Sequence, residues 1–318
     1  MTAVPKTRVT KLREHLPSTW EETLEQFLSW KRAQGISKTT LDDYRRHVGM
    51  FYRRYPDAFG SPPEQVESCL YHYLGDESIK PATYNLRLNY LRAFFKWCVD
   101  KIGMQRNPLE GFKKRKDEGK VIEVDEGALL SLLELPDRTT FTGLRDYALI
   151  VTHLDTGIRP KEAFSLYPSD FNPRSCELYV RQETAKTRVS RTLPLSHQTV
   201  KVIQELLDRR PKEFAKMPIF CSREGTPLTR FTWGDRMEHY SKMLGVKIRP
   251  YDLRHSYATM FLRGGGSPLA LQRGLGHTDL TMTKRYVHLT NNDLKDQHAL
   301  ASPIHRLMPK KTRAGKLK

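Results

Sequence analysis

The chain has 318 residues, which is long enough for two domains of about 150 residues each. Hydrophobic residues make up 38% of the sequence and aromatic residues 10%, so real cores can form and general disorder is excluded. The net charge of +18, from 54 Lys and Arg against 36 Asp and Glu, favours a polyanionic partner, with nucleic acid first and a membrane surface second.

Neither a membrane location nor an oxidising compartment finds support. The longest apolar runs, such as ALIVTHL at 148–154, are far shorter than the about 20 residues that span a bilayer, and no apolar signal region opens the chain. The cysteines form no CxxC pair, which argues against zinc and against a disulfide framework: Cys69, Cys98, Cys176 and Cys221. We expect a reduced, intracellular protein with buried thiols.

Three amphipathic helical patterns occupy the first part of the chain. The pattern at 18–35 begins with Thr19 and Glu22 at capping-box spacing and stops at Gly35. A second pattern follows, and a third spans 81–103, both with apolar residues at steps of three and four. The outer face of the third helix carries the candidate DNA-binding residues Arg87, Arg92 and Lys96. The three patterns predict a small helical domain.

A segment rich in Pro, Gly and charge, RNPLEGFKKRKDEGK, then predicts an interdomain linker. Residues 1–119 hold 21 basic and 15 acidic side chains, or +6, so +12 of the total lies beyond. Two basic parts suit a clamp that holds one polyanion from two sides. The predicted layout is an N-terminal extension (1–16), a helical domain (17–105), the linker (106–120), a second domain (121–290) and a C-terminal helix with a basic tail (291–318).

The second domain mixes helices with a short hairpin. Helical patterns lie around 125–135 and 144–155. Leu178 and Val180 then alternate with polar residues, and after a polar turn the chain returns at 192–195, which predicts a β-hairpin. Helical patterns follow. The expected fold class is therefore mainly α with a small β-hairpin or sheet (α+β).

Four stretches of this domain carry reactive residue types, in the order DTGIRPKEAFSL (155–166), ETAKTRVSRTLPL (183–195), RPYDLRHSYAT (249–259) and LGHTDLTMTKRY (275–286). A tyrosine that cleaves a phosphodiester needs arginines for the non-bridging oxygens and a proton donor for the leaving oxygen. It also needs polar neighbours that help a phenol of pKa about 10 to ionise. Two arginines, a lysine, a histidine and a tyrosine would be sufficient without a metal.

These stretches resemble, in the same order, the boxes of the tyrosine recombinase (phage integrase) superfamily. The resemblance covers about residues 17–290 and implies a core-binding domain followed by a catalytic domain. It places two arginines at the scissile phosphate with a supporting glutamate, and it assigns the catalytic lysine, the histidine and the nucleophile: Arg159, Arg254, Glu162, Lys186, His277 and Tyr286.

One position departs from the family pattern. Three residues before the second arginine the family usually has His, sometimes Lys, and this chain has Tyr251. A phenol can donate a hydrogen bond but is a poor base near neutral pH, so we expect Tyr251 to position the phosphate. The group that takes the proton from Tyr286 stays open. His255 lies about 100° around the helix from Arg254, and we expect it to make a structural hydrogen bond.

The resemblance implies a site-specific DNA recombinase that cuts and rejoins strands through a 3′-phosphotyrosine, without ATP or another cofactor. It implies double-stranded DNA with specific core sites as the partner, bound by two protomers per site and four per synaptic complex. It also implies a C-terminal segment that docks on a neighbouring protomer. The candidate is 291–308, with packing on its own protomer as the alternative.

Several biological and chemical alternatives remain open. With only about 16 residues before the first helix, we expect no separate arm-binding domain, which favours a compact recombinase acting on simple core sites. We expect it to integrate, excise or transpose a mobile element in the prokaryotic cytoplasm, associated with the nucleoid; resolution of chromosome dimers is the alternative. A type IB topoisomerase and a catalytically impaired DNA-binding protein are further alternatives, and an RNA-binding module is disfavoured. No HExxH pair, compact ligand triad or GxxxxGK[ST] loop occurs, so we expect neither a metal site nor ATP binding.

Overall fold

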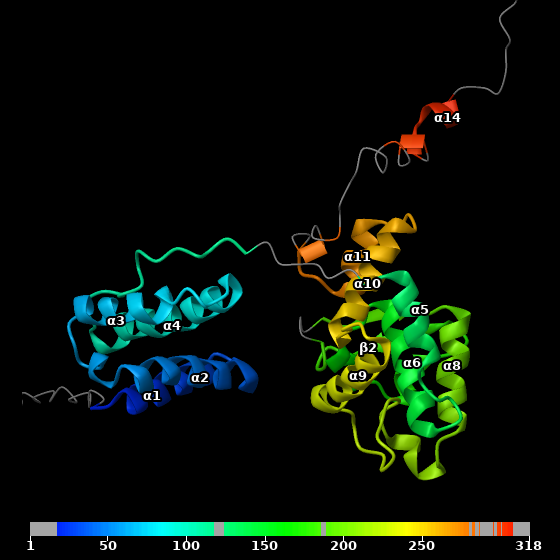
Figure 1. Ribbon diagram of the computed structural model, residues 1–318, viewed down its shortest axis with the longest axis horizontal. Helices are drawn as coiled ribbons and strands as arrows, with labels where there is room; N and C mark the ends of the chain where they lie inside the picture. The colour runs from blue at the N-terminus through cyan, green and yellow to red at the C-terminus, as the bar shows by residue number, and fades with distance from the viewer. Residues whose placement is uncertain are drawn as a thin grey trace, which may run out of the picture. The chain divides into compact units, whose positions relative to one another are not determined.

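The computed structural model describes residues 18–117, 124–185 and 189–279, together with 282, 283, 286, 295, 298, 299 and 301–307. The chain divides into two compact units, Met1–Gly119 and Lys120–Lys318 (Figure 1). Within the described part, no helix combines the length and apolar character that a membrane span requires.

The first unit is helical. It consists of α1 (Trp20–Ala33), α2 (Lys38–Arg54), the 3-10 turn η1 (Pro56–Ala58), α3 (Pro63–Gly75) and α4 (Pro81–Ile102). The capping prediction at the start of α1 is confirmed on one side, because Thr19 accepts from the backbone N–H of Glu22 at 3.2 Å. The Glu22 carboxylate accepts from the backbone of Ser18 instead of Thr19. Helix α3 was not predicted from the sequence.

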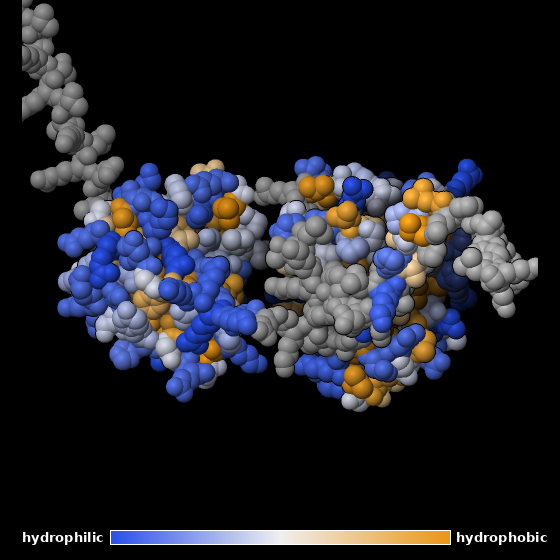
Figure 2. Space-filling model, turned by 90° about the horizontal axis from the view of Figure 1, so that it is seen from above, coloured by the Kyte–Doolittle hydropathy of each residue, from blue (hydrophilic) through white to orange (hydrophobic). Residues whose placement is uncertain are grey.

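Aromatic side chains dominate the core of this unit. Phe27 is fully buried, and its ring meets those of Tyr44, Phe94 and Trp97 edge-on at centroid distances of 5.0, 5.5 and 5.6 Å. Such edge-to-face contacts add to the free energy of burying the rings. The surface seen in Figure 2 is mostly hydrophilic over this unit.

The segment after α4, expected as part of a linker, packs onto the first unit. Leu109 is fully buried in the aromatic core. The guanidinium of Arg115 donates to the carbonyls of Ile79 and Leu74 at 3.2 and 3.1 Å, and Asn85 exchanges two hydrogen bonds with the Arg115 backbone. Its Pro and Gly residues indicated irregular backbone, but they carried no information about these contacts.

The second unit combines helices with one small sheet. Its elements are α5 (Glu126–Glu134), α6 (Phe141–Thr156), α7 (Pro160–Ala163), η2 (Pro168–Asp170), β1 (Phe171–Asn172), β2 (Glu177–Val180), β3 (Arg191–Pro194), α8 (His197–Asp208), η3 (Lys212–Lys216), α9 (Arg230–Leu244), α10 (Pro250–Arg263), α11 (Pro268–Leu275) and α14 (Ile304–Leu307). The predicted fold class, mainly α with a small sheet, is confirmed.

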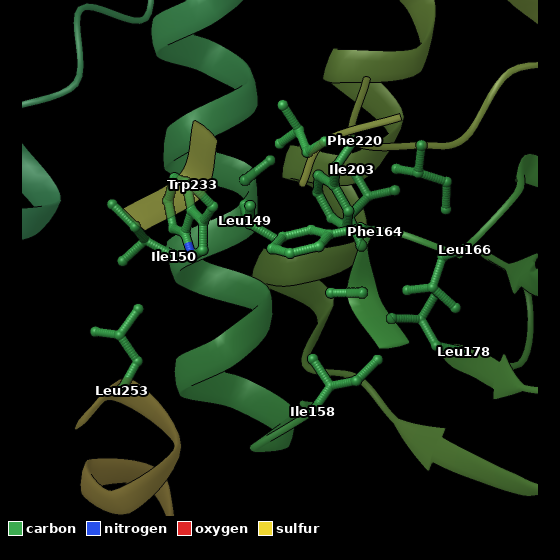
Figure 3. Close-up of a cluster of buried hydrophobic side chains, with 14 of the residues drawn as sticks. Leu149, Ile150, Ile158, Phe164, Leu166, Leu178, Ile203, Phe220, Trp233 and Leu253 are labelled. Carbon is green, nitrogen blue, oxygen red and sulfur yellow. The ribbon is translucent and has the colours of Figure 1, made fainter. Parts of the chain in front are cut away.

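The predicted hairpin is also confirmed. β2 and β3 pair antiparallel with Leu178 opposite Leu193, and β1 adds a third strand to give the order β1-β2-β3. Both leucines are buried, so one face of the sheet joins the core. In Figure 3, Leu149 and Ile150 of α6 lie among side chains from other elements, including Trp233 of α9. Helix α6 packs against α5, α8 and α10 and thereby fixes the two segments that carry Arg159 and Arg254.

Candidate active site

Arg159 lies in the sharp turn between α6 and α7. Gly157 ends α6 with φ +62°, and Pro160 begins α7, so Arg159 is an N-cap residue with extended backbone. A Cβ on Gly157 would lie 2.3 Å from Cδ1 of Tyr257, so both the φ angle and the lack of space require glycine. The TGIRP sequence therefore fixes the backbone position from which the Arg159 side chain extends.

Glu162 holds two arginines in place. Its carboxylate accepts from Arg159 Nη1 at 3.1 Å and from Arg191 Nη2 at 2.6 Å, and the side chain is 1% exposed. Burial alone would raise the pKa of Glu162, but the hydrogen bond and charge of Arg191 and the charge of Arg159 outweigh it and hold the pKa below its usual value. Glu162 therefore stays ionised and orients both guanidinium groups, and its expected supporting role in the reaction stays a prediction.

Three guanidinium groups converge on the C-terminal end of α11. Successive carbonyls there accept hydrogen bonds from Arg191 (Gly274 O, 2.8 Å), Arg254 (Leu275 O, 2.9 Å) and Arg159 (Gly276 O, 3.1 Å). The last carbonyls of a helix lack partners within it and lie at the negative end of its dipole, so they attract cations. Three positive charges face one carboxylate in this cluster. The cluster therefore has a net positive charge that would attract an anion.

Arg254 is the most deeply buried of the three, with 3% exposure. Its Nη1 donates to the carbonyl of Gly157 at 2.6 Å, and its Nη2 lies 3.1 Å from Nε2 of His277. Burial, and then the charge of Arg159, lower the pKa of Arg254 to about 10, while Glu162 and Tyr286 oppose the shift. Arg254 therefore remains a cation at neutral pH.

His277 follows the end of α11 directly. Because a guanidinium can only donate, Nε2 of His277 accepts from Arg254, and its proton lies on Nδ1, which donates to Thr283 Oγ1 at 2.9 Å. Burial, followed by the charges of Arg254 and Arg159, lowers the pKa of His277 to about 4. The imidazole is therefore neutral at physiological pH in the absence of an anion.

Tyr286 is 8% exposed and packs against an apolar cluster that includes Ala258, Leu271 and Leu275, from α10 and α11. Its hydroxyl lies 2.7 Å from Nδ1 of His255. A hydrogen bond was predicted for His255, but its partner, the expected nucleophile, was not. Helix α10 thus presents Arg254 to the arginine cluster and His255 to the phenol.

One of the predicted site residues, Tyr251, is not part of this network among the described residues. Tyr251 lies in the first turn of α10 with 51% exposure, and its hydroxyl makes no hydrogen bond within the described part of the chain. Its expected contact with a phosphate stays a prediction. Lys186 lies outside the described residues, between the end of β2 at Val180 and the start of β3 at Arg191.

Arg191 is the site residue that sequence analysis missed. It begins β3 two residues before the buried Leu193, so both side chains lie on the same face of the strand, and the Arg191 side chain is 10% exposed. A basic residue on the core-facing side of a predicted hairpin is the signal that could have identified it.

The basic residues predicted to bind DNA on α4 have different environments. Arg92 donates to the carbonyls of Leu109 and Phe112, and Arg87 lies over the ring of Tyr73 at 5.0 Å. Lys96 is exposed and pairs with a neighbouring aspartate at 3.5 Å. Two of the three therefore support the fold of the first unit, and contact with DNA stays a prediction for all three.

Among the residues that the structure describes, no three or more His, Cys, Asp or Glu side chains gather into a possible metal site. The expected independence from metals and cofactors stays a prediction.

The order of these site residues along the chain and their geometry agree with the family that the sequence matches. The profile of the phage integrase family matches residues 124–293, which is more than half of the chain. The chain belongs to the phage integrase family. It is a tyrosine-type site-specific recombinase, as its motifs predicted. The family match includes all four stretches that carry the predicted site residues.

Curated relatives of this recombinase match along nearly the whole chain. Tyrosine recombinase XerC of Pelobacter propionicus is 27% identical over 300 residues, covering 93% of this chain and 91% of that protein. Tyrosine recombinase XerD of Pseudomonas putida is 27% identical over 304 residues, covering 91% and 99%. The similarity to Xer recombinases thus extends over both units of the chain.

Solved structures show the same fold. The Tn1549 transposon integrase in complex with a circular intermediate DNA has a TM-score of 0.70 at 18% identity, covering 88% of this chain and 99% of that one. The XerH site-specific recombinase bound to its difH substrate has a TM-score of 0.64 at 19% identity, covering 87% and 83%.

Proposed function

We propose that this recombinase cuts DNA by attack of the Tyr286 hydroxyl on a scissile phosphate. The Tyr286 oxygen forms a bond to phosphorus, the bond to the 5′-oxygen breaks, and the products are a 3′-phosphotyrosine and a 5′-hydroxyl. A second 5′-hydroxyl reverses the attack, so the bond energy is retained without ATP. The observation that carries this proposal is the convergence of the buried Arg254 and two partly buried arginines, Arg159 and Arg191, on one end of α11, with Tyr286 in contact with the helix that holds Arg254.

The arginines keep donors available for a phosphate. A guanidinium has five N–H groups, and Arg254 uses Nη1 and Nη2 for Gly157, Leu275 and His277, which leaves its Nε and one N–H of Nη1. Arg159 uses one hydrogen bond to Glu162 and one to Gly276. Both can therefore stabilise the charge that develops on the non-bridging oxygens without leaving their supports.

The remaining predicted residues complete the reaction. His277 and Tyr251 contribute hydrogen bonds to the same oxygens, and Lys186 gives a proton to the leaving 5′-oxygen. Burial, and then the charges of Arg254 and Arg159, hold the pKa of His277 low, and the negative charge of an arriving phosphate would oppose the effect of the two arginines and raise that pKa. A proton on Nε2 would turn His277 into a donor.

We further propose double-stranded DNA with specific core sites as the substrate, with two protomers per site and four in synapsis. Both units carry excess positive charge, +6 over residues 1–119 and +12 beyond, as a two-sided grip on DNA requires. Arg87, Arg92 and Lys96 stay candidates on the first unit. Among similar structures, a lambda integrase dimer is bound to a core site.

The C-terminal segment 291–308 is proposed to dock on a neighbouring protomer. A groove of about 550 Å³ in the second unit is lined by Leu129, Leu130, Leu133, Leu154, Met260 and Phe261, among others. Ile304 and Leu307 of the segment are 54% and 74% exposed. If the segment docks in trans, removing 291–318 lowers assembly on two-site DNA in sedimentation; unchanged assembly would favour docking in cis.

Integration, excision or transposition of a mobile element remains the proposed biological role, with resolution of chromosome dimers as the alternative. Identity of 27% to XerC and XerD does not choose between them. Sequencing of the DNA that is trapped covalently on the protein in its host distinguishes the two roles. Sites at the ends of mobile elements support integration, excision or transposition, and one fixed chromosomal site supports resolution of chromosome dimers.

The test of the chemistry is a nicked suicide duplex that carries the site. The wild-type protein should form a covalent adduct that Tyr286→Phe abolishes, whereas Tyr147→Phe, a half-buried tyrosine in α6, should retain it. If no adduct forms on a verified site, the protein would be a DNA-binding protein without catalytic activity. An adduct without joint molecules between two sites would favour a type IB topoisomerase.

A further inference from the structure

We propose that His255 is the general base that takes the proton from Tyr286, an inference that rests on the proposed attack by Tyr286. Nδ1 of His255 lies 2.7 Å from the phenol oxygen, within the range for direct proton transfer. The ring centroids are 5.7 Å apart and the planes are inclined by 40°. No motif in the sequence assigned this contact, because it joins residues 31 positions apart.

Packing holds the phenol in this position. The Tyr286 ring belongs to a cluster with Ala258, Leu271 and Leu275, against which Tyr257 and Phe261 also pack. Ala258 lies one helical turn after His255 on α10, so the helix supports the ring and carries its polar partner together. The hydroxyl is thereby aimed at Nδ1 by side-chain packing rather than by a flexible loop contact.

Among the described residues, three other groups that could accept a proton near the arginines already have hydrogen-bond partners. His277 accepts from Arg254 with Nε2 and donates to Thr283 with Nδ1. Glu162 is bound by two arginines, and Asp252 accepts from the backbone and guanidinium of Arg249. Imidazole, with an ordinary pKa near 6.5, is a suitable base near neutral pH, whereas the phenol of Tyr251 is not.

The proton balance is simple. The proposal requires that in the resting enzyme His255 carries its proton on Nε2, so that Nδ1 accepts the hydrogen bond from the phenol. As Tyr286 attacks phosphorus, its proton passes to Nδ1, and the 5′-oxygen receives a different proton from the general acid. In the rejoining step His255 returns the proton as the bond between Tyr286 and phosphorus breaks. Arg254, one residue away, stabilises the phenolate while it forms.

The decisive experiment compares His255→Asn with the wild-type protein, using single-turnover cleavage of the suicide duplex. Asparagine can keep a polar contact near the position of Nδ1 but cannot take a proton. We expect adduct formation to fall by about 10²- to 10³-fold, with unchanged DNA binding in a gel-shift assay. His239→Asn, on the exposed face of α9, is the matched control and should cleave like the wild type.

A more acidic nucleophile separates proton transfer from positioning. Difluorotyrosine in place of Tyr286 should recover at least about tenfold of the rate in the His255→Asn background and little in the wild type, because a more acidic phenol needs less help from a base. Cleavage by His255→Asn within about threefold of the wild type would overturn the proposal, as would an equal effect of the fluorines in both backgrounds.

If His255→Asn does not fold, the wild-type protein still provides the answer. Nitrogen NMR of its imidazoles should show Nδ1 of His255 without a proton; a protonated Nδ1 that donates to the phenol would overturn the proposal. The Tyr286→Phe result keeps the two ideas separate. If the adduct needs Tyr286 but not His255, only the role of His255 as the base is refuted. If the wild-type protein forms no adduct on a verified site, the proposed function is refuted.

Discussion

The interiors of the two units differ in kind. The described core of the first unit is built from aromatic and aliphatic side chains, with Thr23 and His47 as its buried polar residues. The second unit buries charged side chains as well: Arg145, Asp146, Glu162, Asp252 and Arg254 are all at most 4% exposed. Both units enclose large apolar clusters, so burial of charge is an addition to a normal core and not a substitute for one.

This difference indicates that the core of the first unit serves stability, whereas the buried charges of the second unit serve function. Removing a charge from water costs several kcal/mol unless partners replace the lost hydration, so a buried arginine is seldom a device for stability. In the second unit the partners are helix-end carbonyls and one glutamate, and they leave a net positive site. The first unit needs no such arrangement to fold, and its aromatic contacts serve stability.

We expect the largest effect from removing the buried charge of Arg254. Arg254→Ala should lower adduct formation by about 10³- to 10⁵-fold, because an arginine that stabilises transferring phosphoryl charge contributes on that scale. The measurement is single-turnover cleavage, with circular dichroism to verify a folded second unit. Arg209→Ala, at the exposed residue that follows α8, is the control. Cleavage within tenfold of the wild type would mean that Arg254 serves the fold rather than the reaction.

The next effect is expected in the aromatic core. Phe27→Ala should lower the free energy of unfolding of the first unit by about 3 to 5 kcal/mol, since it removes a fully buried ring with several aromatic partners. Three of the four tryptophans, Trp20, Trp30 and Trp97, lie in this unit, so fluorescence during urea unfolding reports on it. The partly exposed Leu86→Ala should cost less than about 1 kcal/mol. Equal losses would contradict the assigned core.

A smaller effect should appear as a dependence of stability on pH. Burial lowers the pKa of His153, which is fully buried in the second unit, from 6.5 to about 4. Between these values the unfolded chain binds a proton that the native unit does not, so stability falls as pH drops from 6.5 towards 4. At about 1.4 kcal/mol per pH unit, the loss from this group approaches about 3 kcal/mol.

The pH effect can be assigned by substitution. His153→Asn, which can retain a donor for the carbonyl of Leu149, should flatten the slope of unfolding free energy against pH in this interval. Burial also lowers the pKa of His47 in the first unit, so the comparison must follow the second unit, for which Trp233 is a local probe. Parallel slopes for variant and wild type would show that His153 is not the group responsible.

Much of the fold and part of the site could be predicted from the sequence because their signals are local. The capping residue Thr19 and the alternation around Leu178 act within a few residues of themselves. The four motifs also stood in an order that identified the family. Helix α3 escaped prediction although Pro63 stands at its first position, and Arg92 was placed on an outer face although it binds backbone carbonyls.

The sequence by itself determined the secondary structure around the motifs, the two-part organisation of charge and the set of reactive side chains. Only the tertiary structure decided what those side chains contact. Arg254 reaches Gly157 across 97 positions, Arg159 reaches Gly276 across 117, and His255 meets Tyr286 across 31. Hydrogen bonds of this kind depend on how α6, α10 and α11 pack together, and no periodicity within one segment encodes that packing.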